Sequence, residues 1–486
     1  MLLSSITRRR PALPGLLALA LTLQLGAAAR ADDPVLAARL DAALQPLGPH
    51  AASAVRVLSL DRKQVLYERN ADLSLNPASN MKLVTSAAAM AKLGPGYRFT
   101  TRVLATVRPD ADGVLAGDLV LQGGGDPVLE TKHLEALADA VKAAGIRRVT
   151  GSLIADDSRY DSERLGNGWN WDDESFYYSA QVGALSVNRN VLQVDVLPGR
   201  AGEPVMVRVH PLDGYLRVVS CPTTSQAGAP TRLSVTRDRG KNEVRISGTL
   251  AEDGKPLLAE DVTVEDPDLF TGELFRKLLA DRGIQLSGVR RGCAAPDAIP
   301  VAHHESVPLS EILPLLNKPS DNFIAEMLCK ELGKACKGAG DWNAGTTVIE
   351  EWLKEIGIDT GGVKVNDGSG LSRLDLVTAR VVSDLLVWVA AQPWKDAFEV
   401  SLPVAGVDGT LRSRLKGTPA EKNVHAKTGS LAHVTALSGY VSTAGGERLV
   451  FSMLINNYPG PLSGASGAKR AEDAVAVALS EYRASP

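Results

Sequence analysis

The hydrophobic pattern at the start of the chain predicts paired strands followed by a helix. Residues 54–60 and 64–68 are mainly apolar and β-prone, and the polar turn between them predicts a hairpin. An alanine-rich segment, residues 79–93, comes next, and the Gly-Pro pair after it is a typical helix end. We therefore expect Ser79 at the N-terminus of a helix, where free backbone N–H groups lie close to its side chain.

The pattern changes between residues 102 and 300. Short β-prone runs, among them 117–122, 205–209 and 243–246, are separated by turns rich in Gly and Asp. One amphipathic helix is predicted at about residues 134–144. This pattern of short strands and turns predicts an insertion of one or two small modules, β-rich or α+β, within a larger fold.

Helices resume after the predicted insertion. Ser320 occupies the position of a cap for a helix that ends near residue 333, and residues 378–391 and 467–482 predict two further helices. Two strand-like runs, 437–442 and 449–455, lie between these last two helices. The final part of the chain therefore mixes helices and strands.

Composition narrows the class of protein. The chain has 486 residues, of which 44% are hydrophobic and 22% are charged, as in a globular protein of two or three structural units. The formal net charge is only −3, and no block of like charges suggests a nucleic-acid surface. A compact or neutral ligand is therefore expected, and nucleic acid is not expected as a partner.

The first residues have the pattern of a signal peptide. Residues 8–10 are three arginines, residues 16–25 form a short apolar run, and Ala29-Arg30-Ala31 suits a signal peptidase. We expect cleavage after Ala31 and export to the periplasm, by the general or the twin-arginine route. No later run approaches the roughly 20 apolar residues that a membrane helix needs, so no transmembrane segment is expected in the mature chain.

Four cysteines and seven histidines are the candidates for disulfides and metal sites. An even number of cysteines in an exported chain permits disulfides, and we favour Cys221 with Cys293 and Cys329 with Cys336. Four free thiols are the alternative. Neither the cysteines nor the histidines have the spacing of a zinc site, so no metal is expected.

Three short motifs carry the candidate chemistry. They are Ser79-x-x-Lys82, then Ser-Asp-Asn at residues 320–322, then Lys-Thr-Gly at residues 427–429. Taken singly, each has a plain explanation as a helix cap, a solvated lysine or an exposed turn. Taken together and in this order, they supply the parts of a serine acyl-transfer site that uses a lysine as its base.

Each motif residue has a predicted role that fits its donors and acceptors. Ser79 attacks, Lys82 accepts its proton, Ser320 relays a proton to the departing amine, and Asn322 fixes Lys82 and the substrate amide. A lysine acts as a base only if burial and a nearby cation lower its pKa, and Lys427 is the candidate cation.

The residues around the third motif are predicted to bind the substrate. Lys427 and Thr428 hold a substrate carboxylate, and Gly429 permits a close approach of the ligand backbone. The backbone N–H groups of Ser79 and Ser430 form the oxyanion hole in this hypothesis.

Further sequence features accompany the three motifs of the predicted acyl-transfer site. The chain also carries Asp-Gly-Ser-Gly-Leu-Ser-Arg at residues 367–373, Gly-Trp-Asn-Trp-Asp-Asp at residues 168–173, and a long insertion between the first two motifs. With these features it resembles the penicillin-interacting serine D,D-peptidases. More narrowly, it resembles the D-alanyl-D-alanine carboxypeptidase/endopeptidase family of class C, low-molecular-mass penicillin-binding proteins.

The resemblance implies a fold, an activity and partners. The expected fold is an α/β, β-lactamase/transpeptidase-like catalytic domain split by a large inserted β-rich and α+β region. The implied organisation is a signal peptide (1–31), the first part of the catalytic domain (32–101), the inserted region (102–300) and the second part of the catalytic domain (301–486).

The implied substrates are peptidoglycan stem peptides that end in D-Ala-D-Ala and D-Ala-diaminopimelate crosslinks, with β-lactam antibiotics as inhibitors and no cofactor. The resemblance also implies that Asp172 and Arg373 border a pocket for the diaminopimelate side chain. Two other functions share some of these features: a serine β-lactamase, and a non-catalytic wall-binding protein with a vestigial site.

Overall fold

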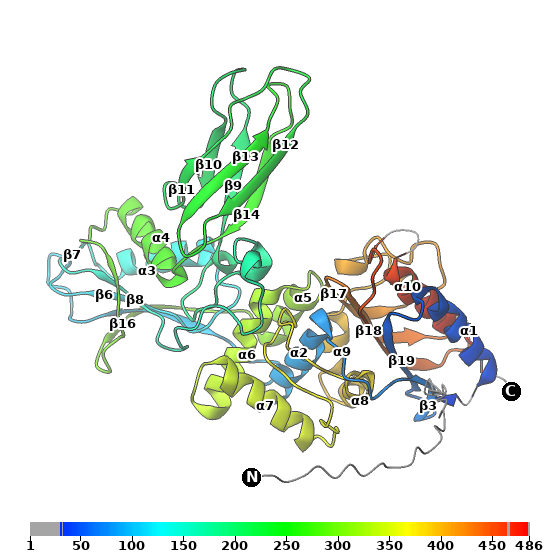
Figure 1. Cartoon of the computed structure of the whole chain (residues 1–486). Helices are drawn as coiled ribbons and strands as arrows, with labels where there is room; N and C mark the ends of the chain where they lie inside the picture. Colours follow the sequence, from blue (N-terminus) through cyan, green and yellow to red (C-terminus); the bar gives the residue numbers. More distant parts are fainter. Residues whose placement is uncertain (1–29, 32, 464–466, 485–486) are drawn as a thin grey trace, which may run out of the picture.

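The computed structural model describes residues 30–31, 33–463 and 467–484 (Figure 1). The predicted signal peptide lies outside the described residues, apart from Arg30 and Ala31, which pair with Glu68 and Tyr67 at one edge of a sheet. Within those described ranges, every helix is too short or too polar to cross a lipid bilayer.

A six-stranded antiparallel sheet forms the centre of the catalytic part. The predicted hairpin is confirmed as two of its strands, with Ser59 paired to Gln64 beside the turn. In spatial order the sheet contains β1 (Arg30–Ala31), β3 (Gln64–Arg69), β2 (Ala52–Ser59), β19 (Arg448–Asn456), β18 (Val434–Ser442) and β17 (His425–Leu431). Strand β17, which contains the Lys-Thr-Gly motif, is therefore the last strand of the sheet.

Helices cover both faces of this sheet (Figure 1). One face packs against α1 (Pro34–Leu44) and α10 (Ala468–Ser480), whose apolar side chains share a core with the sheet. The other face carries α2 (Met81–Lys92), α5 (Leu309–Asn317), α6 (Asn322–Lys337), α7 (Trp342–Glu355), α8 (Ala379–Ala390) and α9 (Lys395–Val400).

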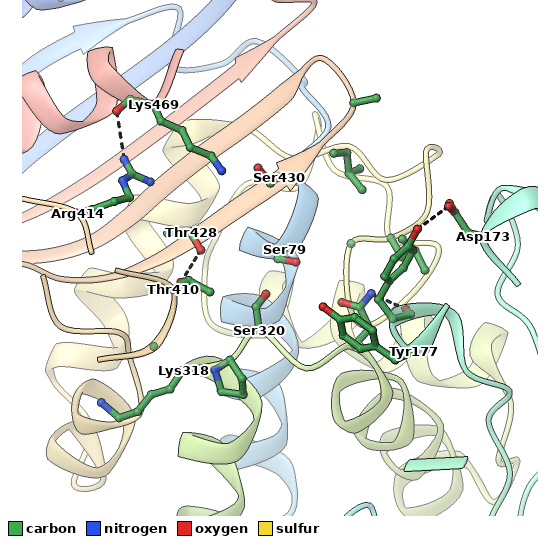
Figure 2. A pocket seen from close by; sticks show the side chains of 18 of the residues that line it. Ser79, Asp173, Tyr177, Lys318, Ser320, Thr410, Arg414, Thr428, Ser430 and Lys469 are labelled. Carbon is green, nitrogen blue, oxygen red and sulfur yellow. Dashed lines mark hydrogen bonds between the residues drawn. The ribbon is translucent and has the colours of Figure 1, made fainter. Parts of the chain in front are cut away.

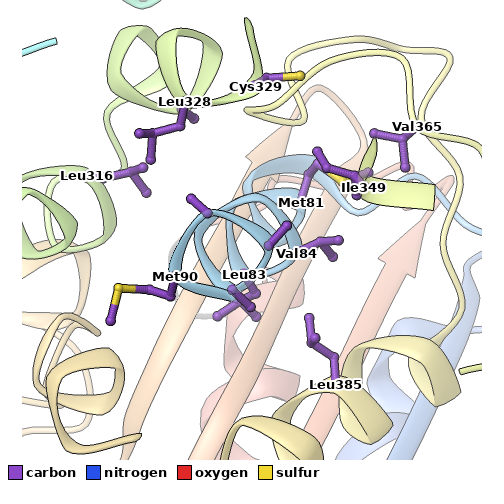
Figure 3. Close-up of a cluster of buried hydrophobic side chains, with 14 of the residues drawn as sticks. Met81, Leu83, Val84, Met90, Leu316, Leu328, Cys329, Ile349, Val365 and Leu385 are labelled. Carbon is purple, nitrogen blue, oxygen red and sulfur yellow. The ribbon is translucent and has the colours of Figure 1, made fainter. Parts of the chain in front are cut away.

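Helix α2 lies at the centre of the second core. Its residues from Met81 to Met90 are all buried, so helices surround it on nearly every side. Figure 3 shows Met81, Leu83 and Val84 of α2 among apolar side chains of neighbouring helices, including Leu328 and Leu385. Burial of this kind stabilises a helix mainly through packing. It fixes the position of the residues just before Met81.

Two predicted helix starts differ from the structure. Ser79 lies in a short 3₁₀ turn, η2 (Ala78–Asn80), that leads into α2. Ser320 does not cap α6, because the Asp321 carboxylate accepts the Ile324 N–H at 3.0 Å and is the cap. Ser320 has φ +66, which is not the extended conformation of a capping residue. Helix α6 also continues past residue 333, to Lys337.

The chain between the first two motifs builds additional sheets. It leaves along β4 (Thr100–Ala105) and returns along β16 (Ile299–Glu305), and these strands pair antiparallel. They belong to a five-stranded sheet whose other strands are β15 (Val289–Arg291), β8 (Leu153–Asp156) and β6 (Leu119–Gln122). The helices α3 (Thr131–Ala143) and α4 (Pro267–Asp281) pack together beside it, and β5 (Val114–Leu115) pairs with β7 (Arg148–Val149).

Two three-stranded sheets project from this region (Figure 1). One contains β10 (Met206–His210), β9 (Val191–Leu197) and β14 (Leu257–Thr263), and the other contains β11 (Arg217–Ser220), β13 (Glu243–Thr249) and β12 (Arg232–Arg237). A single apolar core joins side chains of these sheets with those of α3 and α4. The remaining 3₁₀ turns are η1 (Gln45–Leu47), η3 (Trp171–Asp173), η4 (Tyr177–Ser179), η5 (Asn188–Asn190) and η6 (Gly409–Leu411).

The favoured disulfide pairing is wrong, because all four cysteines are free thiols. Cys329 and Cys336 both lie in α6, seven residues apart, which corresponds to roughly 10 Å along a helix and exceeds the Cα separation of a disulfide. Cys221 follows β11 and Cys293 follows β15, strands of two different sheets, and both side chains are exposed.

Candidate active site

A cleft of about 1020 Å³ lies where the three motifs meet. Ser79, Ser320, Thr428 and Ser430 all line it, and Figure 2 shows their hydroxyl groups facing the same space. They come from the turn before α2, the loop before α6 and the edge strand β17. The fold therefore brings together residues that lie up to 351 positions apart in the sequence.

Lys82 lies directly behind Ser79. Its side chain is fully buried, and its Nζ is 2.9 Å from the Ser79 Oγ. The same Nζ donates to the Asn322 Oδ1 at 2.6 Å and to the Ser369 carbonyl at 2.8 Å. Three acceptors thus orient the amine, and one of them is the hydroxyl that it would deprotonate.

Burial lowers the pKa of the Lys82 amine to about 8, because a buried ammonium has lost its hydration. The carboxyl groups of Asp367, Glu326, Asp321 and Asp375 oppose this effect and keep the pKa from falling further. Burial is therefore the main cause of the lowered Lys82 pKa, whereas the sequence hypothesis also called for the charge of Lys427.

The pKa of the Lys427 amine itself lies well below its usual range, first because of burial and second because of the Lys82 charge. Its Nζ donates to the Ser320 Oγ and to the Thr428 carbonyl, both at 2.8 Å. The Asn80 amide ties the two segments together by donating to the Lys427 carbonyl at 3.0 Å. Lys427 therefore links the second motif to the third.

Two buried carboxyl groups shape the loop that faces Lys82. Glu326 accepts the backbone N–H groups of Gly368 and Ser369 at 2.9 and 2.8 Å. Asp367 accepts the N–H groups of Gly370 and Ser372, both at 2.7 Å. These bonds fix the loop that presents the Ser369 carbonyl to Lys82. Burial and the neighbouring Asp367 raise the pKa of Glu326 to about 7.

Asn322 connects the motif residues to the inserted region. Its Oδ1 accepts from Lys82, and its Nδ2 donates to the Tyr178 carbonyl at 2.7 Å. Tyr178 and the neighbouring Tyr177 belong to η4 and line the cleft opposite β17. We call residues 170–178 the cleft wall, because they close the cleft on the side of the inserted region.

Gly429 is required by the packing of the protein itself. A Cβ at this position would lie 2.8 Å from the Pro77 carbonyl oxygen and 3.2 Å from the Ala78 Cβ. The edge strand therefore packs directly against the turn that carries Ser79. The packing gives a second reason for glycine at this position, and the approach of a ligand backbone stays a prediction.

A comparison with known families decides the assignment. Residues 36–482 match the family described as D-Ala-D-Ala carboxypeptidase 3 (S13). The chain belongs to this family. The match covers nearly all of the chain after the predicted signal peptide, including the inserted region.

Individual relatives of this S13 peptidase agree with the assignment. A D-alanyl-D-alanine carboxypeptidase of Actinomadura is 42% identical over 459 residues, which cover 91% of this chain and 84% of the relative. The crystal structure of penicillin binding protein 4 (dacB) from Haemophilus influenzae is 28% identical, covers 91% of this chain and 99% of that one, and superimposes with a TM-score of 0.80. The same Haemophilus protein has been solved in complex with a β-lactam, with a TM-score of 0.74 and 27% identity over 91% of this chain and 100% of that one. The mixed α/β fold and the serine D-Ala-D-Ala carboxypeptidase class are thereby established.

Of the two residues expected to border a pocket for the diaminopimelate side chain in this S13 peptidase, Arg373 lines the cleft and Asp172 does not. Arg373 lines the cleft, and its Nη1 donates to the Ala432 carbonyl at 3.1 Å. Asp173, and not the exposed Asp172, lines the cleft, and it accepts the Tyr178 hydroxyl at 2.8 Å (Figure 2). Successive side chains of a 3₁₀ turn point about 120° apart, so one step along the chain moves a carboxylate from the cleft to solvent.

Several cleft residues have no motif that would reveal them in the sequence. Thr410 holds the Thr428 hydroxyl, with 2.7 Å between the two Oγ1 atoms. Arg414 and Lys469 line the far end of the cleft, where Arg414 donates to the Lys469 carbonyl (Figure 2). Among the described residues, no three His, Cys, Asp or Glu side chains gather as a metal site would require.

Proposed function

We propose that this S13 peptidase is exported and cleaves peptidoglycan stem peptides through an acyl-enzyme on Ser79. It acts as a carboxypeptidase on D-Ala-D-Ala termini and as an endopeptidase on D-Ala-diaminopimelate crosslinks. The observation that carries the proposal is the buried amine of Lys82, with a pKa of about 8, at 2.9 Å from the Ser79 hydroxyl.

The reaction begins with proton transfer from Ser79 to neutral Lys82. The Ser79 Oγ attacks the carbonyl carbon of the penultimate D-Ala, and the backbone N–H groups of Ser79 and Ser430 stabilise the oxyanion. As the C–N bond breaks, the proton on Lys82 passes through the Ser320 hydroxyl to the leaving amine. Lys82 is then neutral again and activates the water that hydrolyses the ester.

The charge of the cleft supports an anionic substrate. Five basic side chains line it, against one acidic side chain, Asp173. The basic residues are Lys318, Arg373, Arg412, Arg414 and Lys469. Lys427 and Thr428 hold the terminal carboxylate of the substrate in this proposal. Arrival of that carboxylate stabilises the Lys427 ammonium, which burial alone disfavours.

The first test compares the parent protein with Ser79→Ala, using Ser413→Ala as a control because Ser413 also lines the cleft. The parent and the control should release D-alanine from a D-Ala-D-Ala pentapeptide and form a one-equivalent adduct with benzylpenicillin. Ser79→Ala should do neither. Activity that persists in Ser79→Ala contradicts the proposal.

The lifetime of the adduct separates this proposal from a β-lactamase. Intact mass measured over time should show a lasting adduct on Ser79. An adduct that disappears as penicillin is consumed indicates a β-lactamase instead. Export is tested by fractionating cells and sequencing the N-terminus of the recovered protein, which should begin at Asp32 in the periplasmic fraction.

A further inference from the structure

We propose that a second groove beside Ser320 binds the leaving strand of a crosslinked stem peptide. This inference rests on the endopeptidase activity proposed above. The groove has a volume of about 520 Å³, which is within the usual range of ligand sites. We call it the leaving-strand groove and define it by Thr131, Arg189, Gln193, His210, Asp261 and Ser320, all of which line it.

The groove continues from the catalytic cleft. Five residues line both: Tyr177, Tyr178, Pro319, Ser320 and Asn322. Tyr177, Tyr178 and Ser320 therefore border both spaces. A ligand bound at Ser79 can therefore extend past Ser320 into the groove without leaving the protein surface.

The chemistry of the leaving group places it next to the groove. Ser320 delivers the proton to the leaving amine, so this amine lies within hydrogen-bond distance of the Ser320 Oγ. In a crosslink, the carbon that carries the amine also carries a carboxylate and a side chain that continues into the second stem peptide. Lys427 and Thr428 hold the carboxylate, and the side chain needs a separate path. A D-alanine leaving group has only a methyl group here and does not reach the groove.

One side of the groove is a row of polar side chains on a sheet. Gln193 of β9 pairs directly with His210 of β10 and with Asp261 of β14. Residues that are directly opposite in neighbouring strands share a face of the sheet, so these three side chains form one row. The Oδ1 of Asp261 is buried and has no hydrogen-bond partner. An unmet acceptor of this kind suits an N–H donor of a peptide ligand.

A strained turn that leads into β9 also lines the groove. Asn188, Arg189 and Asn190 all have positive φ, between 50 and 57, a conformation that costs energy for residues other than glycine. Asn188 stabilises the turn by accepting the Thr131 N–H at 3.0 Å. The turn carries the Arg189 guanidinium, which is 40% exposed and lies 2.6 Å from the Asp321 carboxylate. Strain held in this way is typical of binding sites.

The charges of the groove fit a zwitterionic peptide. Arg189 and Lys132 are cationic, whereas Glu130, Asp261 and Asp321 are anionic, and all five line the groove. Diaminopimelate-containing peptides carry free amines and carboxylates in close succession. Mixed charges with polar amide partners match such a ligand better than they match a neutral glycan or a polyanion.

The test fills the groove and compares two substrates. Gln193→Trp places a large side chain in the row, and Arg208→Trp is the matched control because Arg208 is exposed on the same sheet outside the groove. For each protein, kcat/KM is measured on a D-Ala-D-Ala pentapeptide and on a peptide dimer crosslinked through D-Ala and diaminopimelate. We expect Gln193→Trp to lower kcat/KM on the dimer at least tenfold and to leave the pentapeptide within twofold.

A second variant tests the charge. Asp261→Leu removes the unpaired acceptor, so the thermal midpoint should stay equal or rise while dimer cleavage falls. If Gln193→Trp leaves dimer cleavage unchanged, or lowers it only as much as pentapeptide cleavage, the groove does not bind the leaving strand. If the parent protein releases D-alanine but does not cleave the dimer, both the endopeptidase proposal and the proposal for the groove are contradicted. The two failures are distinguished by whether the parent or the variant shows them.

Discussion

The floor of the catalytic cleft and its wall are built in opposite ways. On the floor, Lys82 and Lys427 are fully buried, and each amine donates to at least two acceptors of the protein. On the wall, Trp171 is 68% exposed and Tyr177 is 62% exposed. The amines of the floor are therefore buried and held by hydrogen bonds of the protein, whereas the wall presents large side chains to solvent.

This difference separates chemistry from selection. Catalytic groups act best when the protein holds them in place before the substrate arrives, because no reorganisation is then needed during the reaction. Groups that select a substrate need contact with its variable parts, and exposed aromatic side chains provide such contact with little loss of conformational entropy. We infer that the floor performs acyl transfer and that the wall decides which peptide is cleaved.

The wall is nevertheless anchored to the projecting sheets, most extensively through Glu174. Its carboxylate accepts from Arg237 at 3.0 Å, from Arg239 at 3.1 Å and from the Gly240 N–H at 3.2 Å, and its carbonyl accepts from the Thr263 hydroxyl at 2.7 Å. These partners lie on β12, β14 and the loop after β12. The projecting sheets therefore hold the cleft wall in position, although they contribute no catalytic side chain.

The largest effect is expected on the floor. Lys82→Met removes the base and preserves most of the buried volume, so kcat/KM for D-alanine release should fall by about 10³-fold, the range of a lost general base. The rate constant for penicillin acylation should fall in parallel. Lys416→Ala, which removes an exposed lysine outside the cleft, is the control and should change either rate less than tenfold. A parent-like acylation rate in Lys82→Met would show that another group is the base.

A smaller effect on activity is expected at the wall anchor. Glu174→Gln weakens charged hydrogen bonds to Arg237, whose side chain is fully buried, and should lower the free energy of unfolding by about 2 kcal/mol. The KM for a crosslinked peptide should rise severalfold, whereas penicillin acylation should change little.

The control for this variant is Asp238→Asn, which breaks the exposed pair with Arg245 and should cost about 0–1 kcal/mol. Thermal unfolding measures both losses. If Glu174→Gln slows penicillin acylation by as large a factor as it raises KM, the wall and the floor are coupled. That result would contradict the separation of acyl transfer from substrate selection.

The sequence predicted the floor better than the wall for a physical reason. Ser79 and Lys82 lie one helical turn apart, so their proximity follows from local structure, and the other motifs have recognisable residue types. Tyr177, Tyr178 and Asp173 reach the cleft only through the packing of the inserted region, which leaves no local pattern. The expectation for Asp172 was displaced by one residue, because successive side chains of a 3₁₀ turn point about 120° apart and Asp173 is the one that lines the cleft.

Two other errors have similar origins. The helix predicted to end near residue 333 left Cys336 outside it, but α6 continues through both Cys329 and Cys336. Ser320 was predicted to cap α6, but Asp321 takes that position, and Ser320 is left to accept from Lys427. Capping propensity does not distinguish adjacent Ser and Asp residues, so only the tertiary contacts of the loop decide between them.

The most direct test of the account is the pH dependence of penicillin acylation, followed by intact mass, in the parent and in Asp367→Asn. Only neutral Lys82 accepts the Ser79 proton, so the second-order rate constant of the parent should rise with pH through a midpoint near 8. Asp367→Asn removes a negative charge that raises the Lys82 pKa, so its midpoint should move to lower pH. Asp396→Asn removes an exposed carboxylate and is the control, so it should leave the midpoint unchanged. A rate constant that is flat across this range, or an equal midpoint in Asp367→Asn, would contradict the assignment of Lys82 as the base.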